Sequence, residues 1–187
     1  MLFRSSAGAL YIYFESKEAL IAGLCERERA RLTADLATIA AAPDLVEALA
    51  RLGQHYFLEE PRYKRLMLVE IGVESTRNAT VAEVFLQTDR FCLAAFQSLF
   101  TRAAAEGKIA PKLDLKTLSH VFATIGDGIM WRRAVDPSFD GPRVFPVLVC
   151  ILSNMLNPVH IPSSDVTHTV PPTSPVTLPT SLPEVPL

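Results

Sequence analysis

The sequence of 187 residues is poor in the features that mark extracellular, zinc-binding or membrane-spanning chains. Its three cysteines, Cys25, Cys92 and Cys150, lie far apart and form no CxxC pair. An odd number of isolated cysteines argues against a disulfide framework or a zinc site, so we expect reduced thiols in a cytoplasmic protein. The longest apolar run, VFPVLVCIL at 144–152, is too short to cross a bilayer and contains a proline. We therefore expect no membrane partner.

Charge of one sign is also lacking, because 18 Lys and Arg residues stand against 20 Asp and Glu residues. This balance excludes wholesale electrostatic attraction to nucleic acid, so any such binding must come from a local patch. The sequence has no HExxH, GxSxG, Walker or dinucleotide-binding glycine pattern, and it lacks the Glu-x-x-His pairs of di-iron bundles. We predict that the protein is not an enzyme and uses no metal or cofactor.

Helical periodicity fills the middle of the chain, and no stretch shows the alternation of a strand. Apolar residues recur about four apart, as at Leu20, Leu24 and Leu32, and Gly107 is placed to end a helix. The pattern predicts an all-α protein of six or seven helices. Helix starts are predicted at side-chain caps and at prolines: Ser16, Asp44 (with Glu47), Thr80 (with Glu83), Asp114, Pro61 and Pro142.

Residues 158–187 differ in composition from the rest, since they are rich in Pro, Thr and Ser and have no periodicity. Such a segment buries too little surface to offset the entropy of ordering it. We predict a disordered tail, and a proline-rich ligand for a binding module stays open as an alternative.

The segment SAGALYIYFESKEAL, residues 6–20, combines a glycine and two tyrosines with a helix start. Its order and spacing resemble the end of the DNA-binding head of TetR-type (tetracycline-repressor family) transcription regulators. In that family a recognition helix precedes an SKE sequence, which begins the long linking helix. A glycine permits close approach of backbone to DNA, and tyrosine hydroxyls donate to phosphate oxygens. Without the resemblance, a terminal amphipathic helix with core aromatics would be the simpler interpretation.

The resemblance implies a remnant of a helix-turn-helix head followed by a multi-helix ligand-binding and dimerisation domain. The head remnant and linking helix would occupy residues 1–42, with the recognition helix at about 5–14. The helical domain would span 43–157, ahead of the tail at 158–187. The DNA contacts expected from this match are Ser5, Ser6, Ala7, Gly8, Ala9, Tyr11, Tyr13 and Lys17.

The same resemblance implies a homodimeric DNA-binding regulator, expected to be a repressor whose operator binding is relieved by a small-molecule effector. The chain begins just before the third helix of the head, so we expect a member truncated at its N-terminus, with weakened operator binding. The alternative function is a helical ligand-binding and dimerisation protein without autonomous DNA binding.

Pocket and interface residues are predicted from the same half of the chain, although each candidate is also an ordinary core residue. Asp127 stands out as an acid on an otherwise apolar helix. It is either paired with Arg132 or Arg133, or a surface acid. The expected effector pocket comprises His55, Phe57, Met67, Phe91, Phe96, Phe122 and Trp131. The expected dimer interface comprises Ala123, Gly126, Val144, Val147, Leu148, Ile151 and Met155.

Overall fold

The structure, a computed structural model, describes residues 14–159 and is helical over most of that length. Those residues contain no β-strand, which confirms the predicted all-α class. The elements in chain order are α2 (Lys17–Ala41), α3 (Leu45–Gly53), the π-helix η1 (Gln54–Glu59), α4 (Arg62–Ser75), α5 (Ala79–Ala105), α6 (Leu115–Val135) and α7 (Gly141–Leu156).

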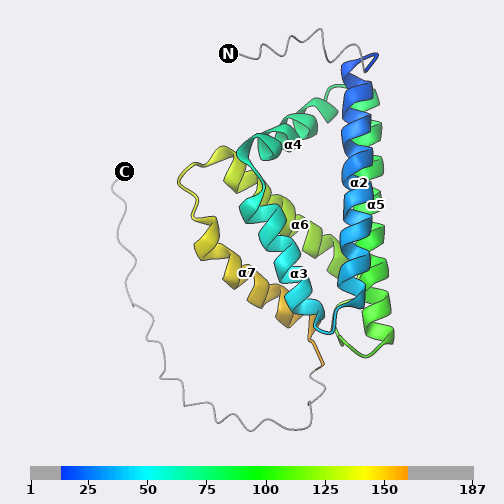
Figure 1. Cartoon of the computed structure of the whole chain (residues 1–187), viewed down its shortest axis with the longest axis vertical. Helices are drawn as coiled ribbons and strands as arrows, with labels where there is room; N and C mark the ends of the chain where they lie inside the picture. The colour runs from blue at the N-terminus through cyan, green and yellow to red at the C-terminus, as the bar shows by residue number, and fades with distance from the viewer. Residues whose placement is uncertain (1–13, 160–187) are drawn as a thin grey trace.

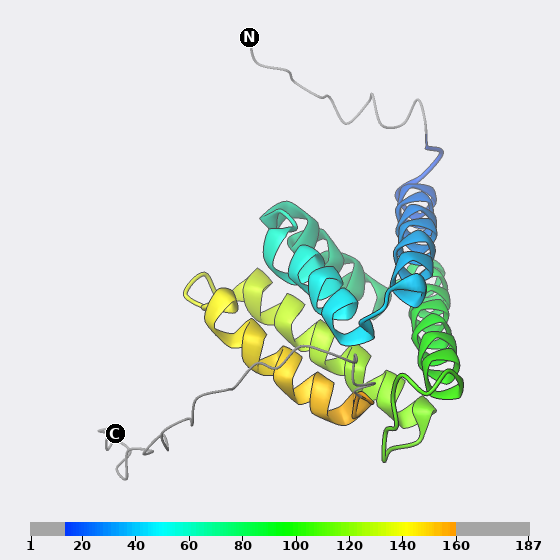
Figure 2. The same cartoon turned by 60° about the horizontal axis from the view of Figure 1, so that its bottom comes forward.

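The two longest helices, α2 and α5, lie side by side and form one edge of the bundle (Figure 1). Helices α3, α4, α6 and α7 lie to one side of this pair, and α7 lies farthest from it in both views (Figure 2). The main core joins the two groups through Leu36 of α2, Leu49 of α3, Phe100 of α5 and Leu118 of α6. A smaller cluster of Ile21, Ile71 and Val81 holds the start of α2 against α4 and α5.

Most helix boundaries follow the predicted local signals. Ser16, Asp44 and Asp114 each accept a hydrogen bond from the backbone N–H three residues later, at 2.9 to 3.0 Å. Gly107 follows the end of α5 with a φ of +71°, the left-handed conformation expected after a helix. These caps confirm that residues close in sequence determine where the helices start and stop.

The capping box predicted at Thr80 is wrong. Helix α5 begins at Ala79, and its cap is Asn78, whose side-chain oxygen accepts from the N–H groups of Thr80 and Val81 at 3.1 and 3.3 Å. Asparagine caps helices at least as well as threonine does, so the earlier residue takes the role. Pro61 is likewise the cap of α4 and not its first residue.

Helix α3 continues without a break into η1, which the sequence pattern did not predict. The N–H of Glu60 donates to the carbonyl of His55 at 3.0 Å, five residues back. Two arginines from other helices satisfy carbonyl groups here: Arg133 of α6 donates to the oxygen of Phe57, and Arg65 of α4 donates to that of Glu60. A π-helical turn is rare, and it is often found where a chain builds a functional site.

Candidate ligand-binding cavity

A cavity of about 540 Å³ lies inside the bundle, and every helix of the described region contributes to its wall. Most of the wall is apolar. Aromatic rings come from η1 (Phe57), α5 (Phe96), α6 (Phe122) and α7 (Phe145). A concave apolar space of this size, with a few polar groups, suits a small organic molecule.

The aromatic wall depends on two glycines that leave room for rings. A Cβ at Gly126 would lie 3.1 Å from Cζ of Phe57, and one at Gly53 would lie 3.1 Å from the ring of Phe145. The two rings are themselves in contact, with centroids 6.4 Å apart. Gly126 therefore allows a helix-to-ring contact within the chain, at the surface of the cavity.

Three of the predicted pocket residues line this cavity: Phe57, Phe96 and Phe122. Met67 and Phe91 are instead partly buried against the two hydrophobic clusters. His55 lies at a separate hollow, described below, and Trp131 is 51% exposed on the outside of α6. The sequence could not separate these cases, because core and cavity use the same apolar residues.

Several wall residues were not predicted to belong to the pocket, among them Tyr56, Asp89 and Cys92. Asp127 also lines the cavity, and it is exposed, in agreement with the surface-acid alternative. Neither Arg132 nor Arg133 pairs with it, since no salt bridge or hydrogen bond to Asp127 occurs within residues 14–159. The position of an acid along a helix does not show which neighbouring helix it faces or which residue it pairs with, because both depend on how the helices pack.

Burial raises the pKa of the Asp127 carboxyl above its ordinary value, and the negative charge of Asp89 raises it further. Burial also raises the pKa of the Cys92 thiol to about 11, with further contributions from Asp89 and Asp127. Cys92 is therefore a protonated, unreactive thiol at neutral pH. Burial is the larger cause of both shifts, the two carboxylates add to it, and the charge of Arg29 opposes them at Cys92.

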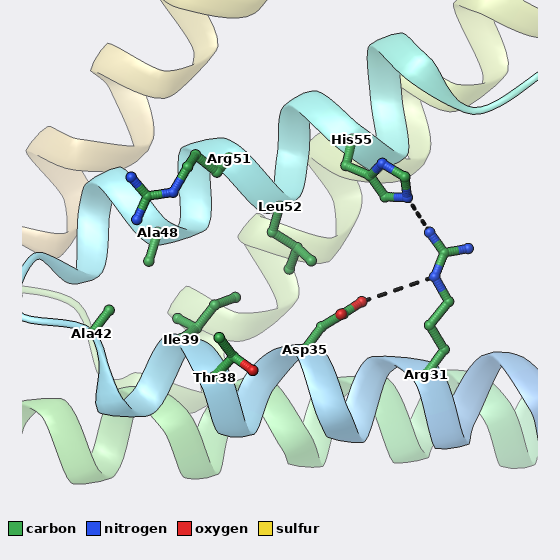
Figure 3. Close-up of a pocket in the computed structure, with 9 residues that line it drawn as sticks. All are labelled: Arg31, Asp35, Thr38, Ile39, Ala42, Ala48, Arg51, Leu52 and His55. Atoms are coloured by element: carbon green, nitrogen blue, oxygen red, sulfur yellow. Dashed lines mark hydrogen bonds and ion pairs between the residues drawn. The ribbon is translucent and has the colours of Figure 1, made fainter.

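A second, more polar hollow of about 330 Å³ lies between α2 and the α3–η1 segment (Figure 3). The Arg31 guanidinium reaches from α2 toward His55 of η1, and its Nε lies 4.0 Å from an oxygen of Asp35. The same guanidinium donates to buried Glu60 at 2.6 Å, and Lys64 contacts that carboxylate at 2.8 Å. This polar network joins α2 to the end of η1 and the start of α4.

Tyr56 connects the two hollows. Its ring lines the cavity, while its hydroxyl donates to Asp35 of α2 at 3.1 Å and Arg31 lies 4.6 Å from the ring centroid. Burial raises the pKa of the Tyr56 phenol, and Asp35 raises it further against the opposing effect of Arg31. The hydroxyl therefore remains protonated and available as a donor.

The start of α2 is tied to the corner between α4 and α5. Lys17 pairs with Glu74 at 3.1 Å, and the Asn78 amide donates to Glu18 at 2.9 Å. Lys17 was predicted to contact DNA, and its side chain is 57% exposed beside this ion pair. The other predicted DNA contacts, and all but the last residue of the expected recognition helix at 5–14, lie outside the described residues.

The outer faces of α6 and α7 expose four large apolar side chains: Trp131, Val135, Val147 and Ile151. Val147 and Ile151 belong to the interface predicted from the sequence. The other predicted interface residues are at least partly buried within the chain: Val144, Leu148, Met155, Ala123 and Gly126, the last two at the cavity wall. Trp131 and Val135 were not predicted to lie on this surface.

Within residues 14–159, no group of three or more His, Cys, Asp or Glu side chains is arranged to hold a metal ion. No helix of that region is long and apolar enough to cross a membrane.

Comparison with known proteins gives matches at the level of structure. No family model and no curated protein matches the sequence. Salmonella enterica GusR, a TetR-family regulator, superposes with a TM-score of 0.61 and 25% identity, over 81% of this chain and 78% of GusR. A TetR transcription regulator from Haloarcula marismortui ATCC 43049 gives a TM-score of 0.59 and 19% identity, over 81% and 79% of the two chains. The chain therefore has the fold of the TetR-type transcription regulators.

Proposed function

We propose that this protein is a small-molecule-responsive transcription regulator of the TetR type, which represses by binding an operator and is released when an effector fills the cavity. The regulator role is supported by the structural neighbours. The observation that carries the effector response is the bond from Tyr56, in the cavity wall, to Asp35 of α2. Helix α2 is the element that follows the predicted recognition segment.

A ligand acts through this contact only if it binds better to one arrangement of Tyr56 and α2 than to another. Tyr56 itself lines the cavity, so an occupant that displaces its ring also shifts its hydroxyl. The link to Asp35 would carry that shift to α2, whose start is held by Glu74 and Asn78. Coupling free energies between regulatory sites are typically about 1–3 kcal/mol, which is within the reach of a few such contacts.

Homodimerisation is part of the proposal. The exposed apolar residues of α6 and α7 form a surface that a second copy would cover, and clustered apolar side chains of this kind mark interaction sites. A dimer would present two DNA-reading segments to the two halves of an operator. The cavity has no assigned catalytic role in this scheme.

The proposal is tested by measuring the affinity of the chain for the promoter DNA of its own and the adjacent gene, by fluorescence anisotropy over a range of salt concentrations. A regulator gives a sequence-specific complex whose affinity falls steeply with salt. A parallel measurement uses the chain extended by the residues encoded in frame upstream. Binding by neither form refutes operator recognition, and binding by the extended form alone favours the alternative, in which this chain only binds ligand and dimerises.

A further inference from the structure

We propose that the cavity selects a singly charged organic cation, namely an amine or ammonium group carried on an apolar body. The inference rests on the proposed function, because it names the chemical class of the effector that the same cavity would take. It is argued from the charges that line the cavity, from their missing partners and from the apolar wall around them.

The charged groups of the wall are all of one sign. Asp89 from α5 and Asp127 from α6 line the cavity, and no Lys, Arg or His of the described region does so. Neither Arg132 nor Arg133, which follow Asp127 on its own helix, pairs with it among the described residues, and Arg133 donates to the carbonyl of Phe57. The wall thus carries two acids and no basic side chain, although Arg29 of α2 lies near enough to act on the cavity residue Cys92.

Neither carboxylate has a hydrogen bond or an ion pair to another residue between Phe14 and Val159. Both residues are exposed, so water satisfies their carboxylates while the cavity is empty. An anion in the cavity would be repelled by the two carboxylates, and a neutral ligand would gain no charge interaction with them. A cation gains a direct charge interaction with them.

A third group in the wall responds to the same charges. Burial raises the pKa of the Cys92 thiol, and Asp89 and Asp127 raise it further, while Arg29 lowers it. Asp89 also raises the pKa of Asp127 itself. Asp89 and Asp127 line the same cavity, so a single cation bound there would interact with both.

The remainder of the wall favours an apolar body with few polar groups. Phe96 and Phe122 lie with ring centroids 4.9 Å apart, and faces of such rings attract cations in addition to packing against hydrocarbon. The Thr88 hydroxyl already donates to the carbonyl of Val84 at 2.9 Å. A sugar or polyol would lack hydrogen-bond partners over most of this surface, which disfavours it as the occupant.

The test compares three soluble probes with one phenylbutyl body and different charge: phenylbutylamine, phenylbutanol and phenylvalerate. Dissociation constants are measured by isothermal titration calorimetry for the full chain and for Asp89→Asn, Asp127→Asn and the double variant. Glu83→Gln is the matched control, because Glu83 is an exposed acid of α5 outside the cavity wall. We expect the amine to bind about tenfold or more tightly than the alcohol, with the carboxylate weakest.

Each asparagine substitution should reduce the preference for the amine by about threefold to tenfold, and the double variant should abolish it, while Glu83→Gln leaves it unchanged. Equal or tighter binding of the alcohol or the carboxylate to the wild-type chain would overturn the inference, as would the absence of binding by all three probes. Ala123→Phe, which fills the cavity, separates the two proposals. If all three probes bind the wild-type chain equally and Ala123→Phe removes that binding, the cavity is still a ligand site and only the preference for a cation fails.

Discussion

The Tyr56 hydroxyl donates a hydrogen bond to Asp35 at 3.1 Å, which joins the wall of the cavity directly to helix α2. The donor and acceptor lie 21 residues apart in sequence and on different helices. Helix α2 also lines the cavity itself, through Cys25 and Leu32, so the Tyr56–Asp35 bond adds a polar contact between η1 and a helix that already forms part of the wall.

Tyr56→Phe should lower the free energy of unfolding by about 1 kcal/mol, because it deletes one partly buried hydrogen bond while keeping the ring. A double-mutant cycle with Asp35→Ala, measured by urea denaturation, should give a coupling energy of similar size. Tyr63→Phe is the control, since that side chain is 68% exposed on α4. Strictly additive effects of the Tyr56 and Asp35 substitutions would show that the bond contributes nothing.

Glu60→Gln should destabilise the protein at neutral pH by about 1–3 kcal/mol, because it removes a charged acceptor that is 7% exposed. Burial alone would raise the pKa of Glu60, but the hydrogen bonds from Lys64 and Arg31 outweigh it, so the pKa is lowered. A lowered pKa means that the stabilisation is present above the unfolded-state value of about 4.3 and is lost as pH falls through the lower folded-state value.

The difference in free energy of unfolding between wild type and Glu60→Gln, measured by urea denaturation, should therefore be largest near neutral pH and shrink in strong acid. Lys64→Met should show the same trend, since it removes one of the two cations that lower this pKa. A difference that is constant across this pH range would mean that the charge of Glu60 has no part in the stability.

Asp127→Asn should raise the melting temperature near neutral pH. The folded state raises the pKa of this carboxyl, through burial and then Asp89, so the folded protein holds the proton more tightly than the unfolded chain does. The contribution of the Asp127 carboxyl to stability is most favourable below the unfolded-state pKa of about 3.9, and it is lost as pH rises through the higher folded-state pKa. Thermal scans of both proteins should converge in acid, and a variant that melts lower than wild type at neutral pH would contradict the assignment.

Two glycine-to-alanine substitutions should change the stability of the protein in opposite directions. Gly107→Ala should destabilise the protein by about 1–2 kcal/mol, because φ at this position is +71° and a Cβ is strained there. Gly72→Ala, inside α4 with no heavy atom within 4 Å of the added Cβ, should stabilise it by up to about 1 kcal/mol. Urea denaturation measures both, and a stabilising Gly107→Ala would show that the end of α5 adopts another conformation.

Val147→Glu combined with Ile151→Glu should convert a dimer to a monomer in sedimentation velocity, if α7 forms the contact between copies. The two side chains are 59% and 45% exposed, so charging them costs the monomer little. Val73→Glu on α4 is the matched control, at 49% exposure on a different face. A wild-type chain that sediments as a monomer at every concentration would refute the proposed dimer.

The helix boundaries could be predicted from the sequence because a cap depends on residues three positions apart. Ser16, Asp44 and Asp114 were correct for this reason, and Thr80 failed only because Asn78 is an equally good cap two residues earlier. The all-α class followed from the same local information.

The cavity could be predicted only in part. Phe57 and Trp131 are both large aromatic residues on helices, yet one lines the cavity and the other is half exposed. The packing between helices decides which face of a helix lines the cavity. The periodicity of apolar residues in the sequence does not show this packing. The π-helix was beyond prediction for a related reason, because the carbonyl group of Phe57 is satisfied by Arg133 of α6, from a distant part of the chain.

The six residues of η1 have a consequence for how this protein can change during evolution. His55 meets Arg31 at the polar hollow, Tyr56 holds Asp35, and Phe57 shapes the cavity, so three consecutive side chains serve three neighbouring structures. Removing one residue from this turn would restore α-helical spacing and rotate the following side chains by about 100°. A length change in this turn would therefore alter the shape of the cavity and the connection to α2 together.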